Sequence, residues 1–244
     1  MWWTLAAGNA SEWTGPTGNN TYLRPDSPSV LIDAGVGRSG HIESIAQRLG
    51  STPLHTVLLT HHHVDHVAGV PALLARWPLA TVRGGGHGVP LHDGEVIAAG
   101  GTRLRAVHTP GHAPDHFCFL DESTCDLFCG DLVRIGGTVV IPASRGGSLR
   151  EYLASLERVR DLAPRRLLPA HGLIIEDPTA LIDAYIAHRR ERERQVIDAL
   201  AAGCRTAAEI VMRVYVDLAP SLRPAAEETV NAHLQKLEDE GRHR

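Results

Sequence analysis

Short apolar stretches, separated by loops that contain glycine or proline, dominate the first 175 residues of the chain. Runs of this length, bounded by turn residues, are typical of buried strands. We predict such strands at residues 30–32, 57–59, 102–107, 127–129 and 167–168. Residues 67–77 have a helical pattern that stops at Pro78, because proline cannot continue a helix. The alternation of strands and helices predicts an α/β fold.

The pattern changes after about residue 180, where strands give way to helices. Two residue pairs have the spacing of capping boxes, which mark helix starts: Ser148 with Glu151, before this change, and Thr206 with Glu209, after it. Further helices are predicted from Pro178 to about residue 200 and over residues 224–240. The mixed charges of residues 189–194 are typical of a solvated helix face. We therefore predict a domain at residues 1–180 and a small helical domain at residues 181–244.

One histidine-rich segment follows the predicted strand at residues 57–59 and fits the pattern H-x-H-x-D-H through His61, His63, Asp65 and His66. In extended chain, alternate residues point to the same side, so His61 and His63 can face one point. Asp65 and His66 turn toward a neighbouring point at the start of the next helix. Because imidazole and carboxylate without thiolate suit zinc, and to a lesser degree iron or manganese, a catalytic metal site is indicated.

Three more side chains of metal-ligand type stand in the same position relative to a strand. His112, Asp131 and His171 each follow a short predicted strand and lie beside a glycine. If the strands lie side by side in a sandwich, these ends meet at one edge, where glycines allow sharp turns. These three strand ends and that of the His61 loop make four, and together they predict one shared metal site.

These motifs, together with Asp33 after another predicted strand, resemble those of the metallo-β-lactamase superfamily, in the same order. The resemblance implies an αββα sandwich with a dinuclear site at its edge. It implies a first metal held by His61, His63 and His112, a second held by Asp65, His66 and His171, and Asp131 between the two. It also implies that Asp33 orients the ligand loop, a role that fits the need to fix histidine tautomers.

Residues 13–22, 187–193 and 232–238 are further similar to the β-lactamase-like protein 2 subgroup. That subgroup appends a winged-helix-like domain to the hydrolase domain, which matches the small helical domain predicted here. His188, at the start of the arginine-rich stretch, is a candidate to approach the mouth of the site; a place on the helix surface is the alternative.

The implied activity is hydrolysis by a hydroxide that bridges two divalent metal ions, Zn²⁺ in preference to iron or manganese. The leaving group takes its proton from metal-bound water or through Asp65, our candidate catalytic residue. The substrate is expected to be a small-molecule ester, thioester, lactone or β-lactam. The alternative is an endoribonuclease that acts on single-stranded RNA.

Charge favours the small molecule over nucleic acid. Residues 1–144 carry eight basic and twelve acidic residues, and residues 186–244 carry ten of each. A helix that enters a DNA groove is normally basic, so the winged-helix-like part is not expected to read DNA. We expect it to serve in packing, in shaping the active-site entrance or in dimerisation, and a homodimer is left open.

Two other classes of protein that share the fold or its metals are alternatives to a hydrolase. One is an oxidoreductase of the persulfide-dioxygenase or flavo-diiron type, and the other is a binding module in which metals only stabilise the fold. Residues 1–7 lack the features of a signal peptide and no apolar run has the length of a membrane span. We expect no membrane association and a cytoplasmic location.

Overall fold

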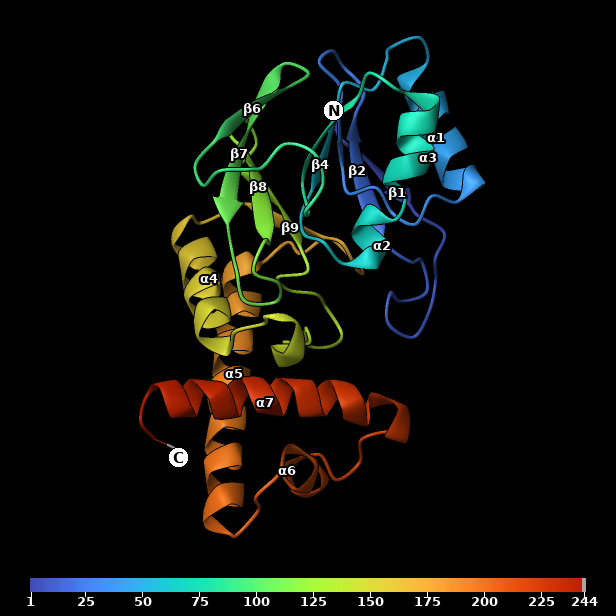
Figure 1. The fold of residues 1–244 in the computed structure, drawn as a ribbon. Helices are drawn as coiled ribbons and strands as arrows, with labels where there is room; N and C mark the ends of the chain where they lie inside the picture. Colours follow the sequence, from blue (N-terminus) through green and yellow to red (C-terminus); the bar gives the residue numbers. More distant parts are fainter. Residues whose placement is uncertain (243–244) are drawn as a thin grey trace.

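Two five-stranded β-sheets, packed face to face, form the centre of the computed structural model, which describes residues 1–242 (Figure 1). The first sheet has the order β1-β2-β3-β4-β5. Its strands are β1 (Trp3–Ala6), β2 (Asn20–Arg24), β3 (Val30–Ile32), β4 (Thr56–Leu59) and β5 (Thr81–Gly84). The pairings are antiparallel from β1 to β3 and parallel from β3 to β5, so β3 and β4 end at the same edge.

The second sheet has the order β10-β9-β8-β7-β6. Its strands are β6 (Val96–Ala99), β7 (Thr102–His108), β8 (Phe117–Asp121), β9 (Asp126–Gly130) and β10 (Arg166–Pro169). Because β8 is antiparallel to both β7 and β9, and β10 is parallel to β9, the strands β7, β9 and β10 run in one direction. Their carboxyl ends therefore share one edge.

Alternate residues of the strands face different hydrophobic cores. Ile32 and Phe128 face the core between the sheets, whereas their neighbours Leu31 and Leu127 face helices on the outside. Helices α1 (Ser39–Leu49) and α3 (Val70–Arg76) cover the first sheet, and α4 (Leu149–Asp161) and α5 (Pro178–Ala201) cover the second (Figure 1). The αββα sandwich implied by the resemblance is confirmed.

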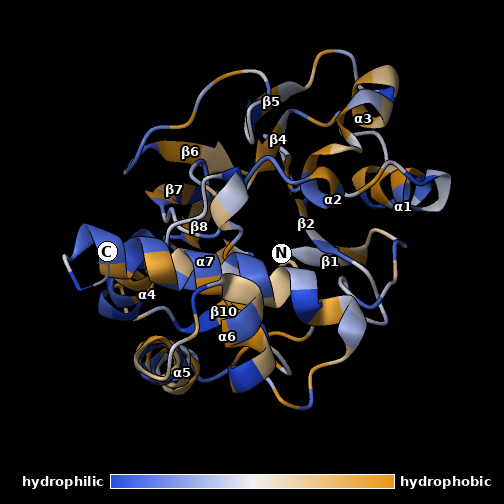
Figure 2. Ribbon diagram, turned by 60° about the horizontal axis from the view of Figure 1, so that its bottom comes forward, coloured by the Kyte–Doolittle hydropathy of each residue, from blue (hydrophilic) through white to orange (hydrophobic). Residues whose placement is uncertain are grey.

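The helical part at the C-terminus has a small core of its own. The end of α5 packs there with α6 (Ala207–Val214) and α7 (Arg223–Asp239) through side chains such as Val196, Ile210 and Val230. Short 3₁₀ helices lie at Ala143–Arg145 and Pro220–Leu222. In Figure 2, α7 crosses the molecule with hydrophobic and hydrophilic residues alternating along it.

The predicted helix starts are present. Ser148 Oγ accepts a hydrogen bond from the backbone N–H of Glu151 at the start of α4, and Thr206 and Glu209 form the reciprocal capping box of α6. Helix α5 is continuous and gives Ile182 to the sheet-side core and Val196 to the C-terminal core. The predicted boundary at residues 180/181 falls in its first turn, and residues 243–244 lie outside the described part.

The helix expected at residues 67–77 is present as α3, and a break at its start separates it from a short preceding helix, α2 (Val64–Val67). Gly69 lies at the break and donates its backbone N–H to the carbonyl of Gly35. A Cβ at Gly69 would lie 2.1 Å from the carbonyl oxygen of Ala34, so only glycine allows this approach. The break leaves α2 as a short turn that carries site residues. Among residues 1–242, no helix is both long enough and apolar enough to cross a bilayer.

Candidate metal centre

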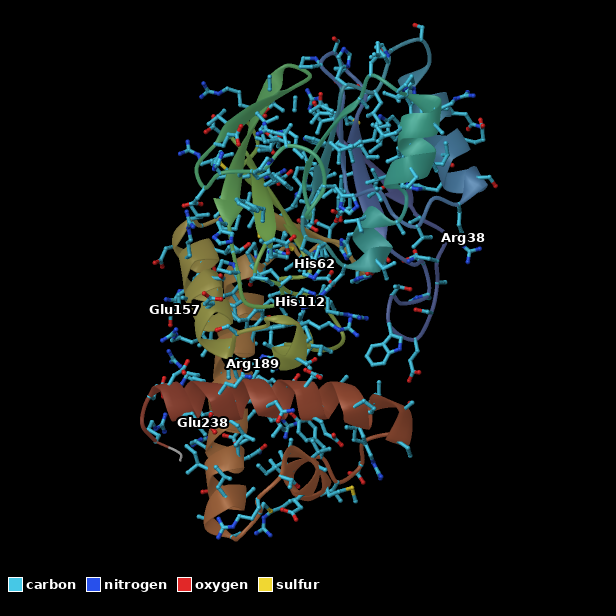
Figure 3. All side chains as sticks on the ribbon, viewed as in Figure 1. Arg38, His62, His112, Glu157, Arg189 and Glu238 are labelled. Atoms are coloured by element: carbon cyan, nitrogen blue, oxygen red, sulfur yellow. The ribbon has the colours of Figure 1, made fainter. Side chains whose placement is uncertain are left out.

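The seven predicted ligands meet at one edge of the sandwich, where strands of both sheets end. His61 follows β4, and His63 to His66 begin α2. His112, Asp131 and His171 follow β7, β9 and β10, the three strands that run in one direction. Figure 3 shows His112 with the neighbouring His62 below the ends of the strands. The convergence inferred from strand ends is thus present in the fold.

The first group of side chains contains His61, His63, His112 and Asp131, whose candidate ligand atoms lie within 4.8 Å of one another. His63 Nδ1 lies 2.9 Å from His61 Nε2 and 2.9 Å from His112 Nε2. Asp131 Oδ2 lies 3.5 Å from His112 Nε2. Three imidazole nitrogens and one carboxylate oxygen therefore face a common point.

The second group contains Asp65, His66 and His171, again within 4.8 Å. Asp65 Oδ2 lies 3.4 Å from His171 Nε2 and 3.5 Å from His66 Nε2. Asp131 Oδ1 lies 3.2 Å from His171 Nε2 and 3.6 Å from His66 Nε2. Asp131 thus presents one oxygen to each group and lies between them.

Hydrogen bonds on the outer side of the site fix the histidine tautomers. His66 Nδ1 lies 2.8 Å from Asp33 Oδ2 and donates to it, and His112 Nδ1 donates to the carbonyl of Val140 at 2.7 Å. His61 Nδ1 lies 3.1 Å from Thr60 Oγ1, which in turn donates to Asp33. Because each proton sits on Nδ1, the Nε2 lone pairs face inward.

These residues fit a pair of cations. Asp131 Oδ1, which faces the second group, is buried and has no hydrogen-bond partner within residues 1–242. Burial lowers the pKa of His61 well below its usual range and that of His63 to about 4, so both are neutral and offer lone pairs. Neutral imidazole nitrogens and a carboxylate oxygen are the donors that such cations take.

Three neighbours of the cluster were not predicted from the sequence. His116 is fully buried, accepts the backbone N–H of Asp131 on Nε2 at 3.2 Å and lies 2.8 Å from Thr109 Oγ1. Thr60 links Asp33 to both His61 and His66. Asn19 donates to Asp65 Oδ2 at 3.0 Å. His116 stands four residues after His112, but that spacing alone does not separate a supporting residue from a surface histidine.

Two other histidines lie away from the cluster. His62 is exposed, lies 2.7 Å from Asp115 Oδ1 and belongs to neither group. His188 is half-buried on α5, where burial and the nearby Arg189 and Arg192 lower its pKa. The neighbour Arg189 is the residue that turns inward: it is 1% exposed, so the solvated face predicted for residues 189–194 is wrong at that position.

Two family models match the chain. The model described as "Metallo-beta-lactamase superfamily" matches residues 13–94 and 79–171, which contain every member of both groups. This chain belongs to the metallo-β-lactamase superfamily. The model described as "Beta-lactamase associated winged helix domain" matches residues 206–244, which confirms the winged-helix likeness of the C-terminal helices.

Named relatives place the chain near the predicted subgroup. The "Beta-lactamase-like protein 2 homolog" of Drosophila melanogaster is 35% identical over 92% of this chain and 84% of its own length. The "Lactamase-like protein vrtG" of Penicillium aethiopicum is 40% identical over 76% of this chain, which spans 61% of that relative's length. The "Atrochrysone carboxyl ACP thioesterase" of Aspergillus fumigatus is 34% identical over 81% of this chain and 68% of its own length.

Solved structures agree on the fold. A "Beta-lactamase domain protein" from Burkholderia ambifaria has a TM-score of 0.84 and 23% identity, with 98% of this chain and 86% of that chain covered. A protein called TTHA1623, solved "in a di-iron-bound form", has a TM-score of 0.57 and 28% identity over 70% of this chain and 95% of that chain. The family and the two candidate sites together support a metal-dependent hydrolase.

Proposed function

We propose that this protein is a dinuclear metallo-hydrolase that cleaves a small-molecule thioester, with esters, lactones and β-lactams as chemically related substrates. The observation that carries the proposal is the position of Asp131, whose two oxygens face two separate groups of ligand atoms. A shared carboxylate of this kind suits a pair of ions that act on one substrate.

In this proposal the three histidines of the first group hold one ion, Asp65, His66 and His171 hold the other, and Asp131 contacts both. The nitrogen and oxygen donors favour zinc, with iron or manganese as alternatives. When bound, such a pair supplies a nucleophilic hydroxide at neutral pH and stabilises negative charge on the substrate oxygen.

The protein's own contribution includes a carboxylate that is held in place at the opening of the site. Asp65 is a quarter exposed, which makes it accessible to substrate, and Asn19 donates to it. Burial would raise its pKa, but His171 and His66 outweigh burial and keep that pKa well below its usual range. The low pKa keeps Asp65 ionised, and we propose that it accepts a hydrogen bond from the attacking water and so orients the water whose proton goes to the leaving group.

Exposed apolar residues close to the ligands along the chain favour a substrate with a hydrophobic acyl part. They are Trp13, Val64, Ile135 and Leu173. Val64 stands between His63 and Asp65, and Leu173 follows His171 by two residues. Arg134 donates to the carbonyl of Trp13 at 3.0 Å and so joins two of the loops. Grouped apolar side chains on a surface mark binding sites.

Thioester hydrolysis suits this site better than cleavage of RNA. A thiol leaving group with a pKa of about 8.5 needs little help from a proton donor, whereas a net charge of -4 does not favour binding of a polyanion. The thioesterase among the relatives supports the same choice. A cytoplasmic location remains a prediction from the sequence, and a homodimer is left open.

The test is a parallel screen of zinc-loaded protein against an acyl thioester, a lactone, a β-lactam and a fluorogenic single-stranded RNA. We expect the thioester to be hydrolysed with the highest kcat/KM. His63→Ala and Asp131→Asn should abolish turnover and reduce bound zinc, which elemental analysis measures. His62→Ala is the matched control, because it changes the adjacent histidine outside both groups and should leave both quantities unchanged.

Cleavage of RNA without thioester hydrolysis would replace the substrate proposal with the ribonuclease alternative. Wild-type turnover by Asp131→Asn would refute the shared carboxylate, whatever the substrate. Oxygen consumption with a persulfide substrate would assign the site to oxidative chemistry.

A further inference from the structure

The loop of residues 132–142 lies between the metal centre and the C-terminal helices. It begins directly after Asp131, and the carbonyl of Val140 accepts the Nδ1 proton of His112 at 2.7 Å. That hydrogen bond holds the proton on Nδ1 and directs the Nε2 lone pair toward His63 and Asp131. The position of the Val140 carbonyl therefore sets the tautomer and the ring orientation of a candidate ligand.

The peptide unit that carries this carbonyl is held from its other side by α7. Its N–H belongs to Ile141 and donates to Thr229 Oγ1 at 3.4 Å, while the carbonyl accepts from His112. One peptide group thus connects Thr229 to His112. Thr229 is buried, and its own hydroxyl donates to the carbonyl of Ala225 in the preceding turn of α7.

The preceding peptide is held by α5. Arg189 Nη2 donates to the carbonyl of Val139. Earlier in the loop, the Tyr185 hydroxyl lies 2.8 Å from the carbonyl oxygen of Arg134 and 3.0 Å from that of Gly137, and donates to one of them. Figure 3 places Arg189 between His112 and α7. Side chains of α5 and α7 therefore hold the backbone of the loop on both sides of Val140, at Val139 and at Ile141.

Arg189 is not held by an ion pair. Its guanidinium lies 5.3 Å from the centre of the Tyr152 ring, its Nε has no hydrogen-bond partner, and no carboxylate of residues 1–242 lies within salt-bridge distance of it. A buried charge without a counter-charge costs folding free energy. Its hydrogen bond to Val139 is the interaction that a purely apolar side chain in its place would lose.

We propose that Arg189 and Thr229 are positioning residues, through which the C-terminal helices hold the Val140 carbonyl against His112 and so set the affinity of the first metal position. The proposal requires the metal centre proposed above but is independent of the substrate. It gives the winged-helix-like part a role in assembling the site.

The test uses the full-length protein, stripped of metal, with Arg189→Met and Thr229→Val. Arg190→Met is the matched control, because Arg190 is the next residue of α5, is exposed and contacts Glu157 at 3.4 Å instead of the loop. Arg189→Lys keeps a donor and is the conservative variant. Zinc affinity is measured by competition with a chromophoric chelator, and the His112 Nδ1 proton is followed in metal-free protein by ¹⁵N NMR.

We expect Arg189→Met and Thr229→Val to weaken one of the two zinc equivalents about tenfold and to speed exchange of the His112 Nδ1 proton. Arg190→Met should match wild type, and Arg189→Lys should recover most of the affinity. If Arg189→Met does not fold, Thr229→Val, which replaces an oxygen with a methyl group, decides the question.

Wild-type zinc affinity and unchanged proton exchange in Arg189→Met or Thr229→Val would overturn the proposal. Equal loss of both zinc equivalents in Arg189→Met and Arg190→Met would also overturn it, since that pattern reports a general loss of structure. Failure of the wild type to bind zinc would refute the metal centre itself, and the proton exchange would still decide whether the two residues position His112.

Discussion

Asp33 offers the sharpest test of how the site is held, because it contacts the cluster without belonging to either group. It is 2% exposed, and its Oδ2 accepts from His66 Nδ1 at 2.8 Å. Its Oδ1 accepts from the backbone N–H of Thr60 at 2.8 Å, and the Thr60 hydroxyl lies 3.0 Å from both oxygens. The perturbation is Asp33→Asn, which keeps the shape but replaces one acceptor with a donor.

The size of the effect follows from these contacts. An asparagine can accept from Thr60 N–H or from His66 Nδ1–H but must direct its NH₂ group at the other donor. One charge-assisted hydrogen bond is lost and one buried donor is left without an acceptor, which together lower the free energy of unfolding by about 1.5–3 kcal/mol. His66 can relieve the clash by moving its proton to Nε2, but that proton removes the lone pair that faces Asp65 and Asp131. We therefore expect a zinc affinity about 10–100-fold lower at the second position.

Two measurements on metal-free protein check these figures: urea denaturation for stability and chelator competition for zinc affinity. Asp126→Asn is the matched control, because Asp126 is also buried and begins β9, the strand that ends beside Asp131. It is paired with Arg165 and Arg166 at the opposite end of that strand. The control should lose stability and keep both zinc equivalents.

Zinc binding by Asp33→Asn with wild-type affinity at both positions would refute the reasoning about the His66 tautomer. An equal loss of zinc affinity in Asp126→Asn would refute it as well, because the effect would then follow stability alone.

Three further predictions concern the fold around the site. Gly111→Ala should lower the free energy of unfolding by about 3 kcal/mol or more in urea denaturation, because the new Cβ would lie 2.3 Å from the Tyr152 backbone at a φ of +132°. The control Gly94→Ala, at a φ of +77° in open space, should lower it by only about 1–2 kcal/mol. Equal losses in the two variants would contradict the argument. Thr206→Ala should destabilise the protein by about 1 kcal/mol, because Thr206 Oγ1 caps Glu209 N at 3.2 Å, and an unchanged urea midpoint would count against the capping box. Burial and the nearby Arg189 and Lys236 lower the pKa of His233 to about 3. The unfolded chain therefore binds a proton at about pH 6.5 that the folded chain does not bind, and the free energy of unfolding falls as pH drops below that value. The free energy of unfolding of His233→Gln should rise by about 2 kcal/mol relative to wild type between pH 7 and pH 5, and parallel pH profiles of the two proteins would exclude this role.

The parts of the site that depend on local spacing could be predicted from the sequence. The His61–His66 segment places four donors within six residues, and the other three donors each follow a strand that is apolar enough to recognise. Strand β2 could not be recognised in this way. Strand β2 begins with Asn20 and Thr21, and both are buried because their side chains bond to the carbonyl of Pro169 and to His41. Partners so distant in sequence leave no periodic signal.

The same reason explains why the supporting residues were missed. His116 holds the backbone of Asp131 only because β8 and β9 are paired in a particular register, and nothing in the local sequence fixes that register. Asn19 lies in the 13–22 segment, whose likeness to the subgroup indicated a shared feature without indicating its contact with Asp65.

Arg189 shows where reasoning from charge patterns fails. A run of alternating charges on a helix predicts a solvated face, because water is ordinarily the best partner for each charge. The prediction fails where a distant backbone carbonyl supplies a partner, and here that carbonyl belongs to Val139, fifty residues earlier in the chain. The position on the helix distinguishes Arg189 from Arg190, yet the sequence alone does not show which side of α5 meets the loop. The burial of Arg189 without a counter-charge therefore indicates that its role is to fix the carbonyl of Val139. The next residue along that backbone, Val140, accepts the hydrogen bond from His112.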